Sequence, residues 1–215
     1  MRSTICLLSI CWLFTDLTTH AYAMELGCPP AVRGTPGSFP LDYNDPENKG
    51  HILYMVESAH MPPSVETLEK GNSSSVGGDL AYVLNAYPNH PRGLNAMARL
   101  GEQEHSEQPH GATYSIPCYF ERAMAFVPQD PIPPMLYGVY LAWNNQDEKA
   151  LKYYQASEAL DPDNANLQYD EGLLYFKMKQ YDKAAEYAHK AYAGGFSLPG
   201  LRLKLQSVGK WSDQP

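Results

Sequence analysis

The sequence predicts an all-α protein in which pairs of helices stack in a row. The main observation is a period of 34 residues, which separates Gly138 from Gly172 and Ala150 from Ala184. Two further pairs of aromatic or apolar residues and one pair of prolines keep the same spacing: Leu141 and Tyr175, Tyr153 and Tyr187, Pro128 and Pro162. A helix pair cannot bury its apolar face alone, so about three stacked pairs are expected. The small residues would let the backbones of neighbouring helices approach closely.

Residues 1–23 are expected to be a signal peptide. Arg2 gives a short positive start, Ile5 to Phe14 is apolar except for Ser9, and Ala21-Tyr22-Ala23 offers small residues for cleavage. The apolar run is shorter than the roughly 20 residues that span a bilayer. A lipoprotein with Cys28 as its lipidated residue is the alternative, but Glu25 stands where that motif has leucine. The prediction is a periplasmic or secreted protein without a membrane span after cleavage.

The charge of the chain argues against some classes of partner. The 215 residues carry a formal net charge of −8, and removal of residues 1–23 takes away Arg2 and Asp16 together. An acidic chain is a poor ligand for nucleic acid or for anionic lipid. Because the charges look dispersed, the acidity is interpreted as a contribution to solubility.

Two cysteines, Cys28 and Cys118, remain after cleavage of the signal peptide. An even number of cysteines in an oxidising compartment favours a disulfide, and the spacing is neither that of a CxxC redox motif nor that of a zinc ribbon. Two separate buried thiols are the alternative. A Cys28–Cys118 bridge would tie the N-terminal segment to the helical body.

The elements are expected in the following order. Residues 24–78 form an irregular segment, with a Pro- and Gly-rich loop over 24–50, short helices over 52–59 and 64–71, and a Ser/Gly linker over 72–78. The helical array covers 79–197, and residues 198–215 form a cap helix over Leu198 to Val208 and a tail.

Within the array, two units are regular and one is not. The regular units are Pro131 to Pro162 and Ala165 to Ser197. The upstream unit has helices over 94–101 and 118–126, joined by a long loop over 102–117, and residues 79–87 form a lone helix before it.

The two regular units resemble tetratricopeptide repeats. In the first, the matching residues are Gly138, Ala150, Tyr154, Asp161 and Pro162, and in the second they are Tyr169, Gly172, Tyr175, Tyr181, Ala184 and Ala191. Ala188 departs from the pattern where the family has an aromatic residue, and Gly194-Gly195-Phe196 replaces the closing proline. More loosely, the chain resembles exported repeat proteins of Gram-negative bacteria.

The resemblance implies a concave groove lined by the first helix of each unit, which would bind a peptide or a partner helix. The inward positions implied are Arg92, Asn95, Arg99, Met135, Val139, Trp143, Tyr169, Leu173, Phe176 and Lys177. Trp143 and Lys177 are expected to be exposed, with Trp143 as the anchor for a partner. The leading hypothesis is therefore a protein-binding module of the cell envelope.

Two other hypotheses compete with it. In one, the N-terminal segment of the same chain fills the groove. In the other, the protein is an enzyme or a metal protein, with Glu57 and His60, or His105 and His110, as the candidate residues. The chain has no GxSxG and no HExxH motif. The sequence therefore predicts no enzymatic activity, no cofactor and no metal site.

Overall fold

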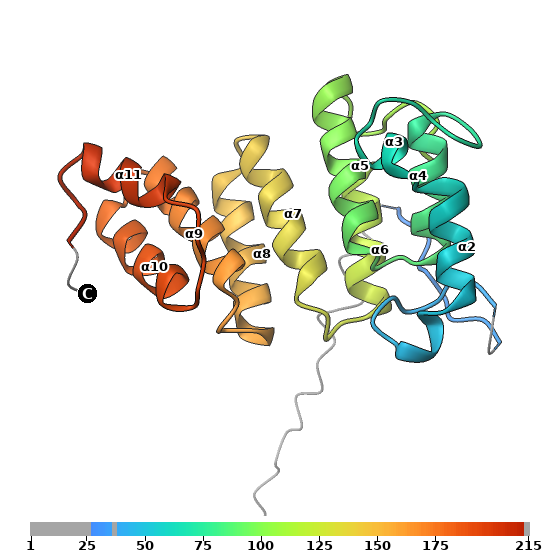
Figure 1. Cartoon of the computed structure of the whole chain (residues 1–215), viewed down its shortest axis with the longest axis horizontal. Coiled ribbons are helices and arrows are strands. Elements are labelled where there is room, and N and C mark those ends of the chain that lie inside the picture. The colour runs from blue at the N-terminus through green and yellow to red at the C-terminus, as the bar shows by residue number, and fades with distance from the viewer. Residues whose placement is uncertain (1–26, 36–37, 213–215) are drawn as a thin grey trace, which may run out of the picture.

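The computed structural model of the protein describes residues 27–35 and 38–212 (Figure 1), so the expected signal peptide lies outside the described residues. These residues form only helices and connecting segments, which confirms the all-α prediction. None of these helices is both long enough and apolar enough to cross a membrane. In chain order the elements are η1 (Pro46–Asn48), α2 (His51–His60), α3 (Pro63–Glu66), α4 (Val76–Ala86), α5 (Pro91–Glu104), α6 (Ile116–Phe126), α7 (Ile132–Trp143), α8 (Asp147–Leu160), α9 (Ala165–Lys177), α10 (Tyr181–Ala193) and α11 (Gly200–Ser207).

The 34-residue period is visible in the backbone of the C-terminal half. Helix α7 packs on α8 and α9 packs on α10, each pair being joined by a turn of three residues (Figure 1). Asn145 and Lys179, which are 34 residues apart, are the middle residues of these turns and have left-handed φ angles of 56° and 61°. The two turns therefore have the same local geometry at the spacing seen in the sequence.

Two small residues allow close packing in these pairs. A Cβ atom added to Gly138 would lie 2.5 Å from the ring of Tyr154 on α8, as expected for a contact inside a helix pair. A Cβ added to Gly172 would lie 2.5 Å from Leu201 on α11, and only then 3.4 Å from Ala184 on α10. Gly172 thus accommodates the last helix of the chain more closely than its own partner helix.

The upstream helices begin and end at residues that differ from the predicted ones. Helix α4 starts at Val76, inside the expected linker, because the Ser75 side chain accepts a hydrogen bond from the Gly78 N–H and caps it. Helix α3 ends at Glu66 and not at Gly71, and Leu68 has a left-handed φ of 64°. Helix α5 extends to Glu104, which shortens the predicted loop to residues 105–115.

The N-terminal segment is attached to the helical body at several points. The Cys28–Cys118 disulfide is present, which confirms the predicted pairing. The Leu41 N–H donates to the Ala86 carbonyl at 2.8 Å, and the Asn89 side chain donates to Asp42 at 2.9 Å. The same Asn89 amide group donates to Asp130 at 3.0 Å. Asn89, in the turn before α5, therefore holds the N-terminal segment and the turn before α7 together.

The apolar core consists of two clusters of buried side chains. The larger one extends from the N-terminal segment through α9, and the smaller one joins α9, α10 and α11. Leu201 and Leu205 of α11 are fully buried in the smaller cluster, so α11 covers the end of the helical row.

Candidate functional site

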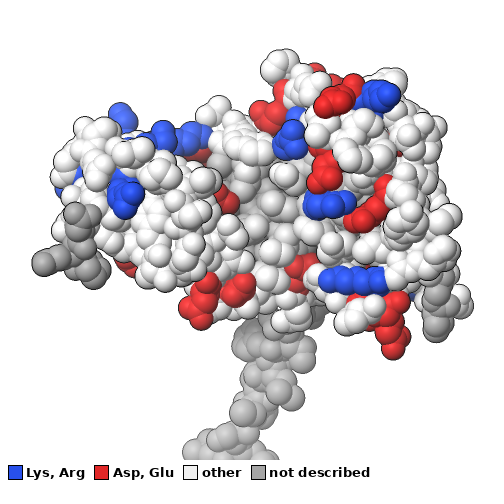
Figure 2. Space-filling model, in the orientation of Figure 1, with Lys and Arg blue, Asp and Glu red and all other residues white. Residues whose placement is uncertain are grey.

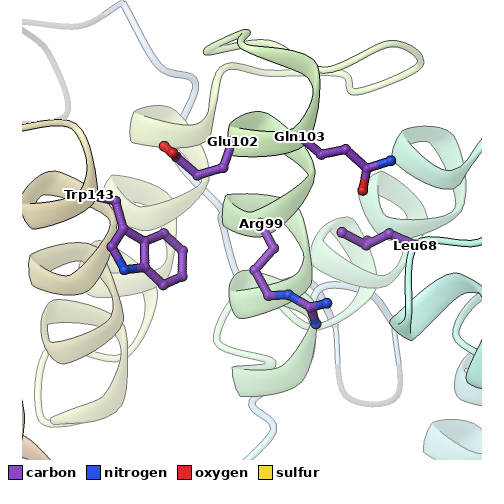
Figure 3. A pocket seen from close by; sticks show the side chains of 5 residues that line it. All are labelled: Leu68, Arg99, Glu102, Gln103 and Trp143. Atoms are coloured by element: carbon purple, nitrogen blue, oxygen red, sulfur yellow. The ribbon is translucent and has the colours of Figure 1, made fainter.

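Two of the ten implied groove residues, Arg99 and Trp143, line one depression on the surface. The depression has a volume of about 360 Å³, and its other lining residues are Leu68, Glu102 and Gln103 (Figure 3). Trp143 reaches into it from the end of α7, Leu68 bounds the opposite side, and the last turns of α5 lie between them. The depression thus joins three elements that are far apart in the sequence.

Trp143 is the more exposed of the two apolar residues that line this depression. It is the last residue of α7, and 44% of its surface is exposed, whereas Leu141 two residues earlier is buried. Successive helical residues differ by about 100°, so a residue two positions from a buried one points in a very different direction. The structure confirms the predicted exposure of Trp143.

Arg99 carries an unneutralised charge in the same depression. Its guanidinium donates to the Glu66 carbonyl at 3.5 Å, and no carboxylate of the described residues forms an ion pair with it. Glu102, one turn further along α5, is engaged otherwise, because its carboxylate accepts a hydrogen bond of 2.7 Å from Asn144. That bond fixes the end of α7 against α5.

Leu68 was not among the residues predicted for the groove. The sequence placed it in a helix over residues 64–71, but the chain leaves the helix after Glu66 and turns at Leu68. A left-handed backbone conformation is uncommon for leucine, and nothing in the neighbouring sequence predicts it. The turn brings the N-terminal segment to the edge of the depression.

Arg92, by contrast, is neutralised inside the molecule. It forms ion pairs with Glu57 at 3.2 Å and Glu66 at 3.5 Å, both of which belong to the N-terminal segment. Helix α2 packs on α4, and α3 packs on α4 and α5. The N-terminal segment therefore lies against the part of α5 that was expected to face a partner.

Lys177 is also engaged within the chain. Its ammonium donates to the Ala142 carbonyl and to the Asp147 carboxylate, each at 2.7 Å. These bonds link the end of α9 to the end of α7 and to the start of α8. The side chain remains partly exposed, as predicted, but its charge already has a partner.

The other six implied groove residues are partly or wholly buried. Asn95 is half-buried on α5, and Tyr169 is buried and stacks on Phe196. The remaining four are half-buried against the two apolar clusters: Met135 and Val139 against the larger one, Leu173 and Phe176 against the smaller one. None of these six lines the depression that contains Trp143.

The candidate metal and catalytic residues are not brought together. Glu57 accepts from His90 at 2.9 Å, whereas His60 pairs with Asp79 at 3.0 Å and stacks on Tyr82. Across residues 27–35 and 38–212, no three His, Cys, Asp or Glu side chains are grouped as a metal site would require. His105 ends α5 in a left-handed conformation, and the His110 backbone N–H donates to Glu104.

Hydrogen bonding controls the ionisation of the buried Asp79. Burial by itself would raise the pKa of this carboxyl group, but the hydrogen bonds from His60 and from the backbone N–H groups of residues 72–74 outweigh it and lower the pKa. Asp79 is thus an ionised group around which the loop before α4 is folded. Nearby, burial lowers the pKa of His90, and its bond to Glu57 offsets this only in part.

Glu171 of α9 is in the opposite situation. It is fully buried, and neither of its carboxylate oxygens has a hydrogen-bond partner within the described part of the chain. Burial, together with the nearby Glu158 charge, raises its pKa to about 8, although Lys190 acts in the other direction. Glu171 lies 34 residues after Tyr137, whose ring packs against Phe120 and Tyr153 in the preceding pair.

No protein-family model matches the chain, and a search of curated proteins finds no match either.

Proposed function

We propose that the protein is an exported interaction module of the tetratricopeptide-repeat type, which binds a peptide or partner helix at the depression formed by α5, α7 and the turn after α3. The observation that carries this proposal is the juxtaposition of the half-exposed Trp143 with Arg99, whose charge has no carboxylate partner among the described residues. Interface residues with the largest energetic contributions are often Trp and Arg.

The lining of the depression indicates the kind of ligand. Trp143 and Leu68 suit an apolar side chain, and Arg99 suits a carboxylate or carbonyl oxygen next to it. A volume of about 360 Å³ corresponds to the lower end of ligand sites and accepts a few side chains, not a whole folded domain. The ligand is therefore proposed to be a short segment with an apolar residue beside an acidic residue or a chain terminus.

The repeat assignment is supported by the two turns with equal geometry at a 34-residue spacing and by the close contact at Gly138. The proposal assigns no catalytic role to any residue. It treats residues 51–70 as one wall of the binding site, since Leu68 lines the depression and Glu57 and Glu66 neutralise Arg92.

The test begins with peptides selected from a random display library on the processed, disulfide-bonded protein. Their affinities are then measured by fluorescence anisotropy for the wild-type protein and its variants. Trp143→Ala should weaken binding by at least about 30-fold, since such anchors are often worth about 2 kcal/mol or more. Arg99→Ala should weaken binding less and reduce its dependence on salt.

Tyr54→Ala serves as the matched control, because Tyr54 is an exposed aromatic residue on α2 outside the depression. It should leave the affinity unchanged. The proposal fails if Trp143→Ala lowers the thermal midpoint and leaves the affinity of the folded protein intact. It also fails if Tyr54→Ala and Trp143→Ala weaken binding equally.

A further inference from the structure

The charge of the chain is distributed unevenly along the helical row. Residues 177–212 contain seven Lys and Arg side chains and two carboxylates, which gives a net charge of +5. The other described residues, 27–35 and 38–176, contain eight Lys and Arg side chains and nineteen carboxylates, which gives −11. The acidity seen in the whole composition is therefore not dispersed, and the C-terminal end of the row is basic.

Ion pairs do not cancel this basic end. Three of its seven cations pair with carboxylates: Lys177, Lys190 and Lys210. The other four, Lys179, Lys183, Arg202 and Lys204, form no ion pair with a described carboxylate. Figure 2 shows Lys and Arg side chains gathered over the end that carries α9 to α11.

Exposed leucines accompany these cations. Leu203 is 56% exposed and lies two residues from both Leu201 and Leu205, which are fully buried, so it points away from the protein. Arg202 and Lys204 flank it on α11, and Leu198, just before the helix, is 61% exposed. The Leu198 carbonyl accepts a hydrogen bond from Tyr192, whose hydroxyl also accepts from the Arg202 N–H, so Leu198 lies beside the start of α11.

The combination of unpaired cations and exposed leucines favours an anionic lipid bilayer as the binding partner. Cations alone suit any anion, but exposed leucines between cations are the composition of surfaces that enter the interface of an anionic bilayer. The acidic remainder does not oppose such contact, because surface charges are screened within about 8 Å at physiological salt and each packed helix adds about 10 Å. Helix α11 lies at the far end of the row from α2 (Figure 1).

We propose that the end of the protein formed by α11 and the neighbouring lysines docks on an anionic lipid bilayer, with the acidic helices directed away from it. This surface is separate from the depression that contains Trp143, which is lined by α5, α7 and the turn after α3. The two proposals are therefore independent.

The test is flotation of the processed, disulfide-bonded protein with lipid vesicles. One set of vesicles is pure phosphatidylcholine, and the other contains about one third phosphatidylglycerol. Binding to the anionic vesicles should be at least about tenfold tighter than to the neutral ones, and it should weaken as salt is raised. The double variant Leu203→Ser/Lys204→Glu should lose about tenfold or more of this affinity.

Leu160→Ser/Lys152→Glu is the matched control, since it makes the same chemical changes at exposed positions of α8. It should bind the vesicles like the wild type, and circular dichroism should show both variants folded. Equal loss in both double variants, or equal binding to neutral and anionic vesicles, would overturn the proposal. So would binding to polyglutamate or salt-sensitive self-association in the absence of vesicle binding, which would identify an acidic polypeptide or a second copy as the occupant.

Discussion

The helices before Pro128 and those after it are held together by different kinds of interaction. From α7 to α10, two helix pairs repeat at a fixed spacing, with three-residue turns and a close helix contact at Gly138. From Cys28 to α6, the connections vary from two to eleven residues, and a disulfide and buried polar side chains such as Asn89 and Asp79 supplement the apolar packing. Both arrangements bury the helix faces and satisfy the polar groups of the backbone, but they do so with different contacts.

The difference follows from the spacing in the sequence. Where small residues recur every 34 positions, each helix pair buries its face on the next one, and short turns satisfy the backbone locally. Asn89 in the turn before α5 and Asp130 in the turn before α7 are 41 residues apart, and Asn89 donates both to Asp130 and to Asp42 of the N-terminal segment. Specific contacts between distant segments therefore replace regular packing in the N-terminal region.

Removal of the disulfide is expected to have the largest effect, and this effect should be confined to the N-terminal region. Cys28→Ser/Cys118→Ser removes a bridge between residues 90 positions apart, and this should lower the free energy of unfolding by about 4 kcal/mol. Hydrogen exchange should show lost protection in α2 to α6, while α7 to α10 retain theirs. Equal loss of protection on both sides would mean that the chain unfolds as one cooperative unit, contrary to the comparison.

Alkaline pH should weaken the C-terminal region through Glu171. The pKa of Glu171 in the folded protein, about 8, lies above its ordinary value of 4.5. The protonated carboxyl group therefore contributes its full stability below pH 4.5, and this contribution is lost as pH rises through the pKa of the folded protein. Glu171→Gln should therefore raise the free energy of unfolding by about 2 kcal/mol at pH 9 and change it little at pH 4.5. Urea unfolding at the two pH values provides the measurement, and an equal effect at both would contradict the assignment.

Acid should act on the N-terminal region instead. The pKa values of His90 and Asp79 are both lowered in the folded protein. His90 stabilises the fold above its ordinary pKa of 6.5, and this contribution is lost as pH falls through the folded value; Asp79 follows the same direction from its ordinary 3.8. Hydrogen exchange at pH 4 should therefore show earlier opening of α4 and α5 than of α9 and α10.

Two glycine variants compare contacts inside the C-terminal region. Gly138→Ala places a methyl group against the Tyr154 ring at 2.5 Å, and the overpacking should cost about 1–3 kcal/mol. Gly172→Ala meets only the end of the Leu201 side chain, which can move. Both variants gain about 1 kcal/mol in helix propensity, so the difference between them comes from how far the neighbouring side chain can yield. Thermal unfolding should rank Gly138→Ala clearly below Gly172→Ala; the reverse order would show that α11, not the α7–α8 contact, limits stability.

The smallest effect is expected for Lys177→Met. Its bonds to Asp147 and the Ala142 carbonyl are partly exposed, so removing them should cost less than about 1 kcal/mol. Because the charge is used inside the molecule, the affinity for selected peptides should remain unchanged, with Arg99→Ala as the comparison. A loss of affinity equal to that of Arg99→Ala would show that Lys177 contributes to peptide binding after all.

Several features of the protein could be predicted from the sequence because they depend on local patterns. The 34-residue period indicated α7 to α10, and the two remaining cysteines indicated their disulfide. The position of Trp143, two residues after Leu141 and just before a polar stretch, indicated that it is exposed. These properties follow from spacing along one helix or from the number of residues of one type. They need no knowledge of which distant segments meet.

The composition of the candidate site arose only from tertiary contacts. Arg92 and Lys177 pair with carboxylates about 30 residues away, and Leu68 reaches the depression through a left-handed turn. The partner of a charge depends on the packing of separate segments, which a helical period does not encode. Of the ten implied groove residues, only Arg99 and Trp143 share one depression in the folded protein, because neighbouring segments cover or neutralise the others.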